Sequence, residues 1–232
     1  MAPPLPPLQI LFEDNHCLAI YKPAGYLTTG YEGGEETLDR QVKAYLKEKF
    51  NKPGNVFLGV VHRLDRPVSG VLMYARNSKA AGRLAEQFRE SEVDKVYWAV
   101  VEGKVEPQKG TWENWLWKDT MQGKVQTVKF GTPGAKLARL DFHCKAADEK
   151  HTWIELHPRT GRTHQLRVQL ASRGYPIVGD DKYGSTEKFP NGIALHARAL
   201  TFKHPISYEP MTLTAPLPAS WKGFRSLGLE AA

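Results

Sequence analysis

Short runs of hydrophobic residues, separated by turn-forming residues, predict a protein built largely of β-strands. Residues 8–13 and 17–22 have the composition of two strands joined by a short polar turn. Residues 138–145 alternate between apolar and polar side chains, the pattern of a half-exposed strand in an antiparallel sheet. Residues 95–103 are apolar on both alternating faces, which predicts a strand buried on both sides. Further strands are predicted at residues 125–130, 152–156 and 193–203.

Three segments have the hydrophobic spacing of an amphipathic helix. The first begins after Thr37, a possible N-cap, and ends at the sequence Asn51-Lys-Pro-Gly. Ser78 is predicted to cap the second, whose apolar stripe includes Leu84. The third is predicted to be capped by Thr163 and to end at Gly174.

A charged turn lies between residues 56–61 and 71–75, two apolar runs that predict buried flanking strands. The turn places Asp65 between Arg63 and Arg66. Nearby positive charge favours the ionised form of a carboxyl group, so Asp65 is a candidate nucleophile or base. The same residue could instead be a turn former or an ion-pair partner.

The segment from residue 156 to 179 contains four arginines and neither aspartate nor glutamate. This pattern fits either a phosphate-binding surface at the start of the predicted helix or a solvated basic face. Arg167 differs because it lies one turn inside that helix, between Leu166 and Val168. A guanidinium at the edge of a core is best satisfied by a carboxylate, in a bidentate pair where geometry permits.

Composition predicts one soluble domain at residues 1–232, of which residues 1–7 form a mobile Pro-rich arm, and no separate N-terminal RNA-binding domain is expected. The net charge of +7 favours a polyanionic partner. Only Cys17 and Cys144 are present, so a disulfide framework is excluded, and we expect a cytoplasmic monomer. The histidines match no familiar zinc spacing, so no metal is expected.

Four separated segments of the chain form a set of motifs. They are His62-Arg63-Leu64-Asp65-Arg66 followed by Ser69-Gly70, Lys22-Pro-Ala-Gly, Lys95-Val-Tyr-Trp-Ala and the run from Thr160 to Arg167. The first resembles the signature of the RluA/TruC-type pseudouridine synthases, and the others are similar to further motifs of that family. One departure is Val68, where the family commonly has Thr. The resemblance implies an α+β fold with an extended, mixed but mostly antiparallel sheet, flanking helices and a central RNA-binding cleft.

The resemblance also implies roles for single residues. Asp65 would be the catalytic residue, Tyr97 would stack on the target uracil, and Arg167 would pair with Asp65, although Arg162 could take that place. Arg63 would fill the space of the flipped base. The remaining RNA contacts expected are Arg66, Arg159, Arg162, His164 and Lys95.

The implied reaction is the isomerisation of uridine in tRNA or rRNA, which changes no redox state and needs no cofactor. Two other classes fit the same charge pattern. A binding-only RNA chaperone would keep the fold without the reaction. A glycoside or nucleoside hydrolase would need a second carboxylate beside the scissile bond, and Asp141 and Glu155 lie on predicted strands without evident convergence.

Overall fold

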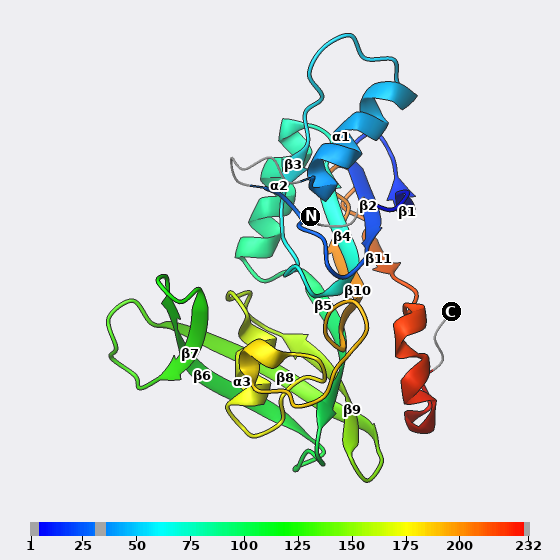
Figure 1. Ribbon diagram of the computed structural model, residues 1–232. Helices are drawn as coiled ribbons and strands as arrows, with labels where there is room; N and C mark the ends of the chain where they lie inside the picture. Colours follow the sequence, from blue (N-terminus) through cyan, green and yellow to red (C-terminus); the bar gives the residue numbers. More distant parts are fainter. Residues whose placement is uncertain (1–4, 31–35, 230–232) are drawn as a thin grey trace. The chain divides into compact units, whose positions relative to one another are not determined.

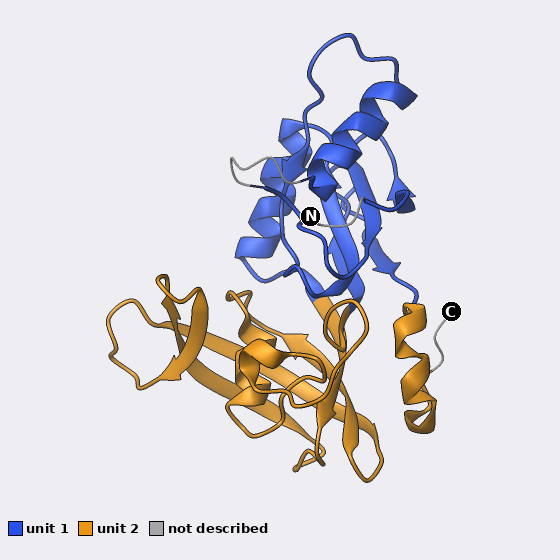
Figure 2. Ribbon diagram, in the orientation of Figure 1, with its two compact units in different colours: residues 1–94, 197–216 blue, residues 95–196, 217–232 orange. Residues whose placement is uncertain are grey.

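The computed structural model describes residues 5–30 and 36–229. The chain forms two compact units (Figure 2), the first from residues 1–94 and 197–216 and the second from residues 95–196 and 217–232. Of the predicted Pro-rich arm, residues 1–4 lie outside the described residues, and residues 5–7 are neither helix nor strand. The expectation of one catalytic domain stays a prediction.

The first unit contains a sheet with the strand order β1-β2-β4-β10, in which β3 pairs with β4 and β11 with β10 (Figure 1). The pairings β1–β2 and β2–β4 are antiparallel, and Leu18 lies opposite Tyr74. The predicted hairpin near the N-terminus and the strand at residues 71–75 are confirmed. The strands are β1 (Gln9–Glu13), β2 (Cys17–Lys22), β3 (Gly59–Val60), β4 (Ser69–Ala75), β10 (Leu195–Lys203) and β11 (Pro210–Thr214).

Two helices complete this unit, α1 (Leu38–Lys49) and α2 (Ser78–Arg89). Thr37 is the N-cap residue of α1, as predicted, although its side chain makes no capping bond. The predicted cap of α2 is wrong by one residue, because Asn77 accepts the N–H of Ala80 at 2.9 Å. The core on one face of the sheet is formed by residues that include Cys17, Ala19, Met73, Ala75, Leu84 and Phe202.

The prediction of a buried strand at residues 56–61 is wrong. Only Gly59 and Val60 pair with β4, and the side chains of Phe57 and Val60 are 49% and 38% exposed. An apolar run does not reveal how many of its residues find a pairing partner, and here the pairing lasts two residues. The segment from residue 61 is therefore a loop that leads into the charged turn.

Gly70 ends that turn at a place where no other residue fits easily. Its φ of +128° lies outside the range that L-residues adopt readily, and a Cβ atom would lie 2.3 Å from the carbonyl oxygen of Ala197. The absence of a side chain thus allows β10 to approach β4 closely.

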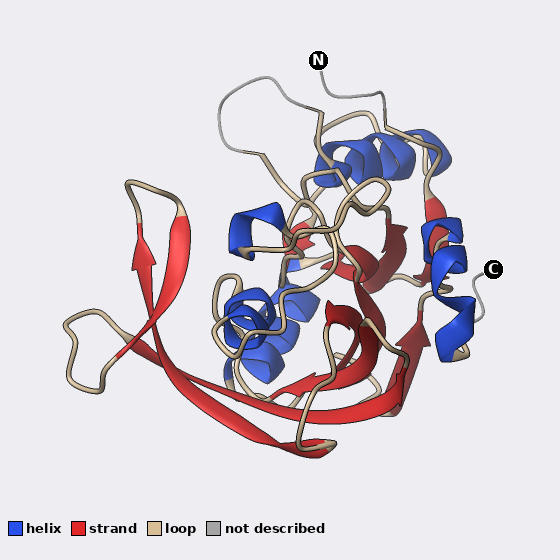
Figure 3. Ribbon diagram, turned by 60° about the horizontal axis from the view of Figure 1, so that its bottom comes forward, coloured by secondary structure: helices blue, strands red, loops and turns tan. Residues whose placement is uncertain are grey.

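The second unit contains a sheet with the strand order β5-β9-β8-β6-β7, and its pairings are antiparallel. The regular secondary structure of this unit is mostly strands, which are drawn red in Figure 3. Residues 99–101 of β5 are buried, but residues 95–98 are only half-buried, so the predicted burial on both faces holds for part of the strand. The strands are β5 (Asp94–Glu102), β6 (Lys109–Asp119), β7 (Lys124–Val128), β8 (Lys136–Ala147) and β9 (His151–Pro158).

The helix predicted at residues 163–174 is shorter than expected. It is α3 (Gln165–Ala171), and its N-cap residue is His164, which has a φ of +51°, rather than Thr163. A turn follows that ends at Gly174, so the glycine marks the end of the turn and not of the helix. Two short 3-10 segments, η1 (Asp181–Tyr183) and η2 (Ala219–Leu227), follow later in the chain.

Among the described residues, no helix has the length and apolar character needed to cross a membrane. The α+β class and the mostly antiparallel sheet agree with the sequence prediction.

Candidate active site

The charged turn of the first unit is a loop that presents Asp65 between two exposed arginines, Arg63 and Arg66. The Asp65 side chain is half-buried, whereas Leu64 and Val68 are buried and anchor the loop on both sides. The N–H of Val68 donates to the Asp65 carbonyl at 3.0 Å and closes the turn. The sequence thus places a carboxylate at the middle of a short loop whose ends are fixed.

The segment from residue 22 to 28 binds the main chain of this loop. The Gly25 N–H donates to the Arg66 carbonyl at 2.8 Å, and the Arg66 Nε donates back to the Gly25 carbonyl at 3.0 Å. The Thr28 hydroxyl donates to the Leu64 carbonyl at 3.1 Å and accepts the Leu64 N–H at 3.2 Å. The loop therefore has hydrogen bonds to a second segment both before and after Asp65.

Lys22 lies under the same loop and is fully buried. Its Nζ donates to the carbonyl oxygens of Pro23, Arg66 and Val68 at 3.1, 3.1 and 2.7 Å. An ammonium group has three donors, and all three find main-chain acceptors here. The pKa of Lys22 is lowered to about 7, mainly by burial. Within this net value, Asp65 raises the pKa and Arg66 lowers it.

His62 fixes the other side of the loop. Its Nε2 accepts the Met73 N–H at 3.0 Å, and its ring stacks on Phe88 with the centroids 4.8 Å apart. Both contacts hold the ring in place, so His62 helps to orient the loop.

In the second unit, Tyr97 lies on β5 directly opposite Leu156 of β9. Residues directly opposite each other in an antiparallel pair share one face of the sheet, so Tyr97 lies on the face to which the buried Leu156 belongs. The next residue, Trp98, has the other orientation, and its Nε1 donates to Glu155 at 3.1 Å. Tyr97 and Lys95 are half-buried.

Arg167 has the bidentate carboxylate partner that its position predicts, and this partner is Asp180. Nε and Nη2 of Arg167 each lie 2.7 Å from one of the two Asp180 oxygens. The Arg167 and Asp180 residues are 5% and 0% exposed, so the pair is buried. The guanidinium also lies over the ring of Tyr183, with its carbon 5.0 Å from the ring centroid.

Tyr183 connects this ion pair to His164. The Tyr183 hydroxyl lies 2.8 Å from Nδ1 of His164 and accepts the N–H of Val125 at 3.0 Å. His164, which the sequence assigns to RNA contact, is thereby held at the start of α3.

The other arginines of this segment have more partners in the structure than the sequence indicates. Arg159 forms an ion pair with Asp141 at 2.7 Å, because β8 supplies an acid that is distant in the sequence. Arg173 donates to Asn114 and lies over the ring of Trp112. Arg162 is exposed, and its Nε donates to the Leu137 carbonyl.

The start of this helix also differs from the phosphate-binding helix N-terminus that the sequence predicts. With seven residues, α3 is short, and the Gln165 side chain already accepts the N–H of Arg162 at 3.1 Å. The pairing of Arg167 or Arg162 with Asp65, and the trio of these residues with Tyr97, join residues of the two units and stay predictions.

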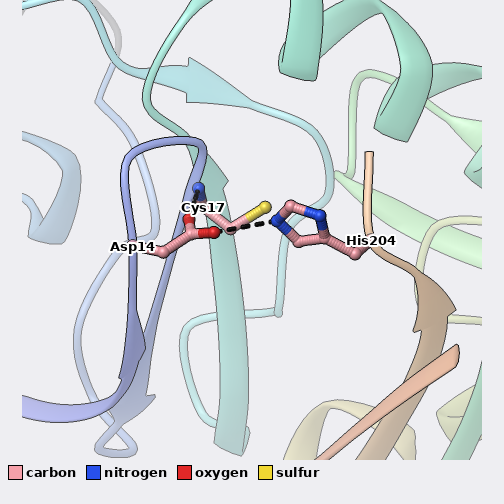
Figure 4. A group of neighbouring side chains, drawn as sticks. All are labelled: Asp14, Cys17 and His204. Carbon is pink, nitrogen blue, oxygen red and sulfur yellow. Dashed lines mark hydrogen bonds and ion pairs between the residues drawn. The ribbon is translucent and has the colours of Figure 1, made fainter. Parts of the chain in front are cut away.

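One group of side chains has the atoms of a metal site. A carboxylate oxygen of Asp14, the sulfur of Cys17 and a ring nitrogen of His204 lie within 4.8 Å of one another (Figure 4). Burial raises the pKa of the Cys17 thiol to about 12, so it stays protonated. Metal binding would need a thiolate.

The hydrogen bonds of this group also argue against a metal. Nδ1 of His204 accepts the N–H of Ser207 at 3.1 Å, which leaves the proton on Nε2, and Nε2 donates to Asp14 at 2.8 Å. The second Asp14 oxygen accepts the N–H groups of His16 and Cys17. Burial raises the pKa of Asp14, but these bonds outweigh it and hold the pKa below its ordinary value. The group fits a hydrogen-bonded connection between the β1–β2 turn and the β10–β11 turn.

Comparison with known proteins identifies the class. Residues 16–172 match the model of the RNA pseudouridylate synthase family. The chain is 34% identical to tRNA pseudouridine synthase C of Haemophilus ducreyi, covering 93% of both chains. It is 36% identical to ribosomal large subunit pseudouridine synthase C of Yersinia pestis, covering 90% of this chain and 65% of the relative.

Solved structures agree with the sequence matches. The chain is similar to human RNA pseudouridylate synthase domain containing 4, with a TM-score of 0.78 and 25% identity over 94% of this chain and 93% of that one. The chain therefore belongs to the RNA pseudouridylate synthase family. It is an RNA-modifying isomerase.

Two features of the site were not expected from the sequence alone. The sequence shows Lys22 only as the first residue of the Lys22-Pro-Ala-Gly motif, and its full burial is unexpected because lysines are mostly exposed. Asp180 was not noted as a partner of Arg167, because nothing in the sequence marks a contact across thirteen residues.

Proposed function

We propose that this enzyme converts uridines of tRNA or rRNA to pseudouridine, with Asp65 as the nucleophile. The observation that carries the proposal is the loop around Asp65, in which a half-buried carboxylate lies between two exposed arginines and its main chain is held on both sides. Relatives named for tRNA and for ribosomal RNA support both substrate classes.

The reaction breaks the bond between N1 of uracil and C1′ of the ribose, and it forms a bond from C5 of the same ring to C1′. C5 then loses its proton and N1 gains one, so atoms and electrons balance without an oxidant or a second substrate. An anionic carboxylate can stabilise and trap the electron-poor centre formed when the glycosidic bond breaks. No step requires a cofactor.

The other residues have supporting roles in this proposal. Tyr97 stacks on the target uracil and keeps the detached base in place while it turns. Arg167 pairs with Asp65 and favours its ionised form, in addition to its bond with Asp180. Arg63 fills the space that the flipped base leaves in the RNA.

The RNA backbone would be bound by cationic side chains near the two segments that carry these residues. Arginine and lysine neutralise phosphate charge and release counterions, which supplies much of the affinity for RNA. The contacts proposed are Arg66, Arg159, Arg162, His164 and Lys95. We further propose that the enzyme acts as a monomer in the cytoplasm.

The test is the Asp65→Asn variant, which keeps the size of the side chain and removes its charge. The variant and the unchanged enzyme are incubated with transcribed tRNA and rRNA fragments, and pseudouridine is measured by mass spectrometry of the digested RNA. We expect kcat to fall by about a thousandfold or more, as for the loss of other essential nucleophiles. RNA affinity should stay within about twofold, because phosphate contacts supply it.

The outcomes distinguish the possible functions. Pseudouridine formation by Asp65→Asn would contradict the assignment of the nucleophile. RNA binding by the unchanged enzyme without pseudouridine in any cellular RNA would favour an RNA chaperone, a reading that the family match does not favour. Release of free uracil would indicate a hydrolase.

A further inference from the structure

Tyr183 is the last residue of η1 and lies three positions after Asp180, the carboxylate partner of Arg167. The N–H of Tyr183 donates to the Asp180 carbonyl at 3.0 Å and closes the turn. Side chains three positions apart in a 3-10 turn lie on the same side of it. One short turn therefore presents both a carboxylate and an aromatic ring to the guanidinium of Arg167.

The carboxylate and the ring restrain Arg167 in different directions. The two bonds with Asp180 hold the guanidinium in the plane of the carboxylate, and they oppose movement within that plane more than a tilt out of it. The ring of Tyr183 faces the guanidinium carbon at 5.0 Å and attracts the cation to its π face. The ring thus opposes the tilt that the ion pair alone resists least.

The hydroxyl of Tyr183 extends this contact to His164. It lies 2.8 Å from Nδ1 of His164 and accepts the N–H of Val125 at 3.0 Å. His164 is the N-cap residue of α3, three positions before Arg167, and its own side chain makes no capping bond. The bond with Tyr183 therefore holds the imidazole in place at the start of α3.

The position of Tyr183 is set by the sheet of the second unit. Its side chain is 8% exposed and belongs to a hydrophobic cluster with Leu116 of β6 and Val125 of β7. Its neighbour Lys182 donates from Nζ to the carbonyl of Gly123, in the turn between β6 and β7, at 2.7 Å. Tyr183 can thus serve as a fixed support for two side chains that belong to α3.

We propose that Tyr183 is a positioning residue with two separable tasks: its hydroxyl sets the imidazole of His164 for RNA contact, and its ring sets the guanidinium of Arg167 for the reaction. The inference rests on the proposed function, in which both residues take part. Placement of a participating group matters because a displacement of about 1 Å can lower the rate by about a hundredfold.

Two substitutions separate the tasks. Tyr183→Phe removes the hydroxyl and keeps the ring, whereas Tyr183→Leu removes both. We expect Tyr183→Phe to raise the Kd for RNA by about three- to tenfold, the effect of one hydrogen bond, with the single-turnover rate constant within about twofold. Tyr183→Leu should raise the Kd equally and also lower that rate constant by about tenfold or more. Pseudouridine is measured with the RNA used for the unchanged enzyme, at saturating enzyme concentration.

A double-mutant cycle tests whether the hydroxyl acts through His164. Residues that act through one shared contact have non-additive effects. We expect His164→Ala to raise the Kd for RNA by about three- to tenfold, and the addition of Tyr183→Phe to raise it by less than about twofold more. Two rises that multiply in the double variant would overturn this part of the inference.

Two controls measure a merely structural effect. Tyr175→Phe removes another tyrosine hydroxyl of the same unit, which lies 3.5 Å from the N–H of Glu106. Leu116→Ala weakens the hydrophobic cluster that contains Tyr183. Every variant is assayed at a temperature at which it is fully folded, and both controls should keep the Kd and the rate constant of the unchanged enzyme. Nitrogen NMR shifts of the His164 ring should change in Tyr183→Phe and stay constant in Tyr175→Phe.

The outcomes decide each task separately. An unchanged Kd in folded Tyr183→Phe would overturn the role of the hydroxyl, and an unchanged rate constant in folded Tyr183→Leu would overturn the role of the ring. Losses of equal size in Leu116→Ala would reduce Tyr183 to a structural residue. If Tyr183→Leu does not fold, Tyr183→Phe and the cycle with His164→Ala still decide the first task. These results are distinct from a failure of the proposed function, in which the unchanged enzyme forms no pseudouridine or Asp65→Asn remains active.

Discussion

The two units each bury one cation beside a proposed catalytic segment, and they satisfy it in different ways. In the first unit, Lys22 is 0% exposed and donates to three main-chain carbonyls. In the second, Arg167 is 5% exposed and forms two bonds with the carboxylate of Asp180. One cation thus binds neutral oxygens of the backbone, and the other binds an anion.

This difference shows what each cation does for its surroundings. The three donors of an ammonium group point in separate directions, so Lys22 can join carbonyls from two segments and fix the course of a loop. The planar guanidinium of Arg167 matches one carboxylate and also lies over the ring of Tyr183, so it fixes side chains. The carbonyl groups compensate the buried charge of Lys22 only in part, so burial lowers its pKa to about 7 even though Asp65 raises it.

The largest effect is expected when the ion pair of the second unit is broken. Arg167→Met leaves the fully buried Asp180 carboxylate without its bidentate partner. Loss of one member of a buried pair costs about 3–5 kcal/mol, so the free energy of unfolding should fall by that amount in urea titrations. This loss would lower activity even if Arg167 took no part in the reaction.

A second substitution separates stability from chemistry. The double variant Arg167→Met with Asp180→Leu removes both charges and should regain much of the lost stability, since a buried pair can often be replaced by apolar residues. If the double variant is stable but inactive, Arg167 is needed in the reaction itself. If Arg167→Met unfolds at the same urea concentration as the unchanged protein, the pair does not stabilise the unit. The contrast drawn between the two buried cations, Lys22 and Arg167, is then wrong.

A second effect is expected in the pH dependence of the first unit. The pKa of Lys22 is about 7 in the folded protein and near its ordinary value of 10.5 when unfolded. Between these values the unfolded chain binds a proton that the folded protein does not, so the free energy of unfolding rises with pH across this window. The expected slope from this group is up to about 1.4 kcal/mol per pH unit.

Lys22→Met is the control for this pH dependence. The difference between its free energy of unfolding and that of the unchanged protein should change between pH 7 and pH 10, because other titrating groups are common to both. Urea titrations at three or more pH values within the window measure it. A constant difference would mean that Lys22 keeps its proton in the folded protein at these pH values.

The sequence predicts most strands and the motif loop, because alternation of side chains and turn residues are local properties. It also predicts that Arg167 needs a carboxylate, since an arginine inside a helix at the edge of a core has less access to water. The pairing of that arginine with Asp180 depends on the turn after α3, whose course is not a local property. For the same reason the sequence predicts a strand over the whole apolar run at residues 56–61, although only two of its residues pair.

The sequence predicts the reacting residue of the candidate site but not the residues that hold its loop. The motif identifies Asp65 through its resemblance to a family. Thr28 and Lys22 have no pattern that links them to residues 36 to 46 positions later in the chain. Such contacts are set by the packing of β2, β4 and the loops between them, and they become visible only in the structure.

The smallest effect on stability is expected at the surface, where Arg159 pairs with Asp141. The Arg159 side chain is 55% exposed, so this pair is screened by water, unlike the buried pair of Arg167. Arg159→Ala should therefore lower the free energy of unfolding by less than about 1 kcal/mol. If Arg159 binds a phosphate, RNA affinity should fall for all sequences, and the slope of log Kd against log salt should decrease by about 1.

Arg89→Ala is the matched control, because Arg89 is also an exposed arginine in ion pairs, with Glu86 and Glu90, but lies on α2 outside the proposed contacts. Both variants should unfold at nearly the same urea concentration, and only Arg159→Ala should change the salt slope. Equal slopes would show that the basic segment of the second unit is a solvated face. A large loss of stability in Arg159→Ala would show that exposure does not separate the Arg159–Asp141 pair from the Arg167–Asp180 pair, and that the contrast between buried and surface charges has to be drawn elsewhere.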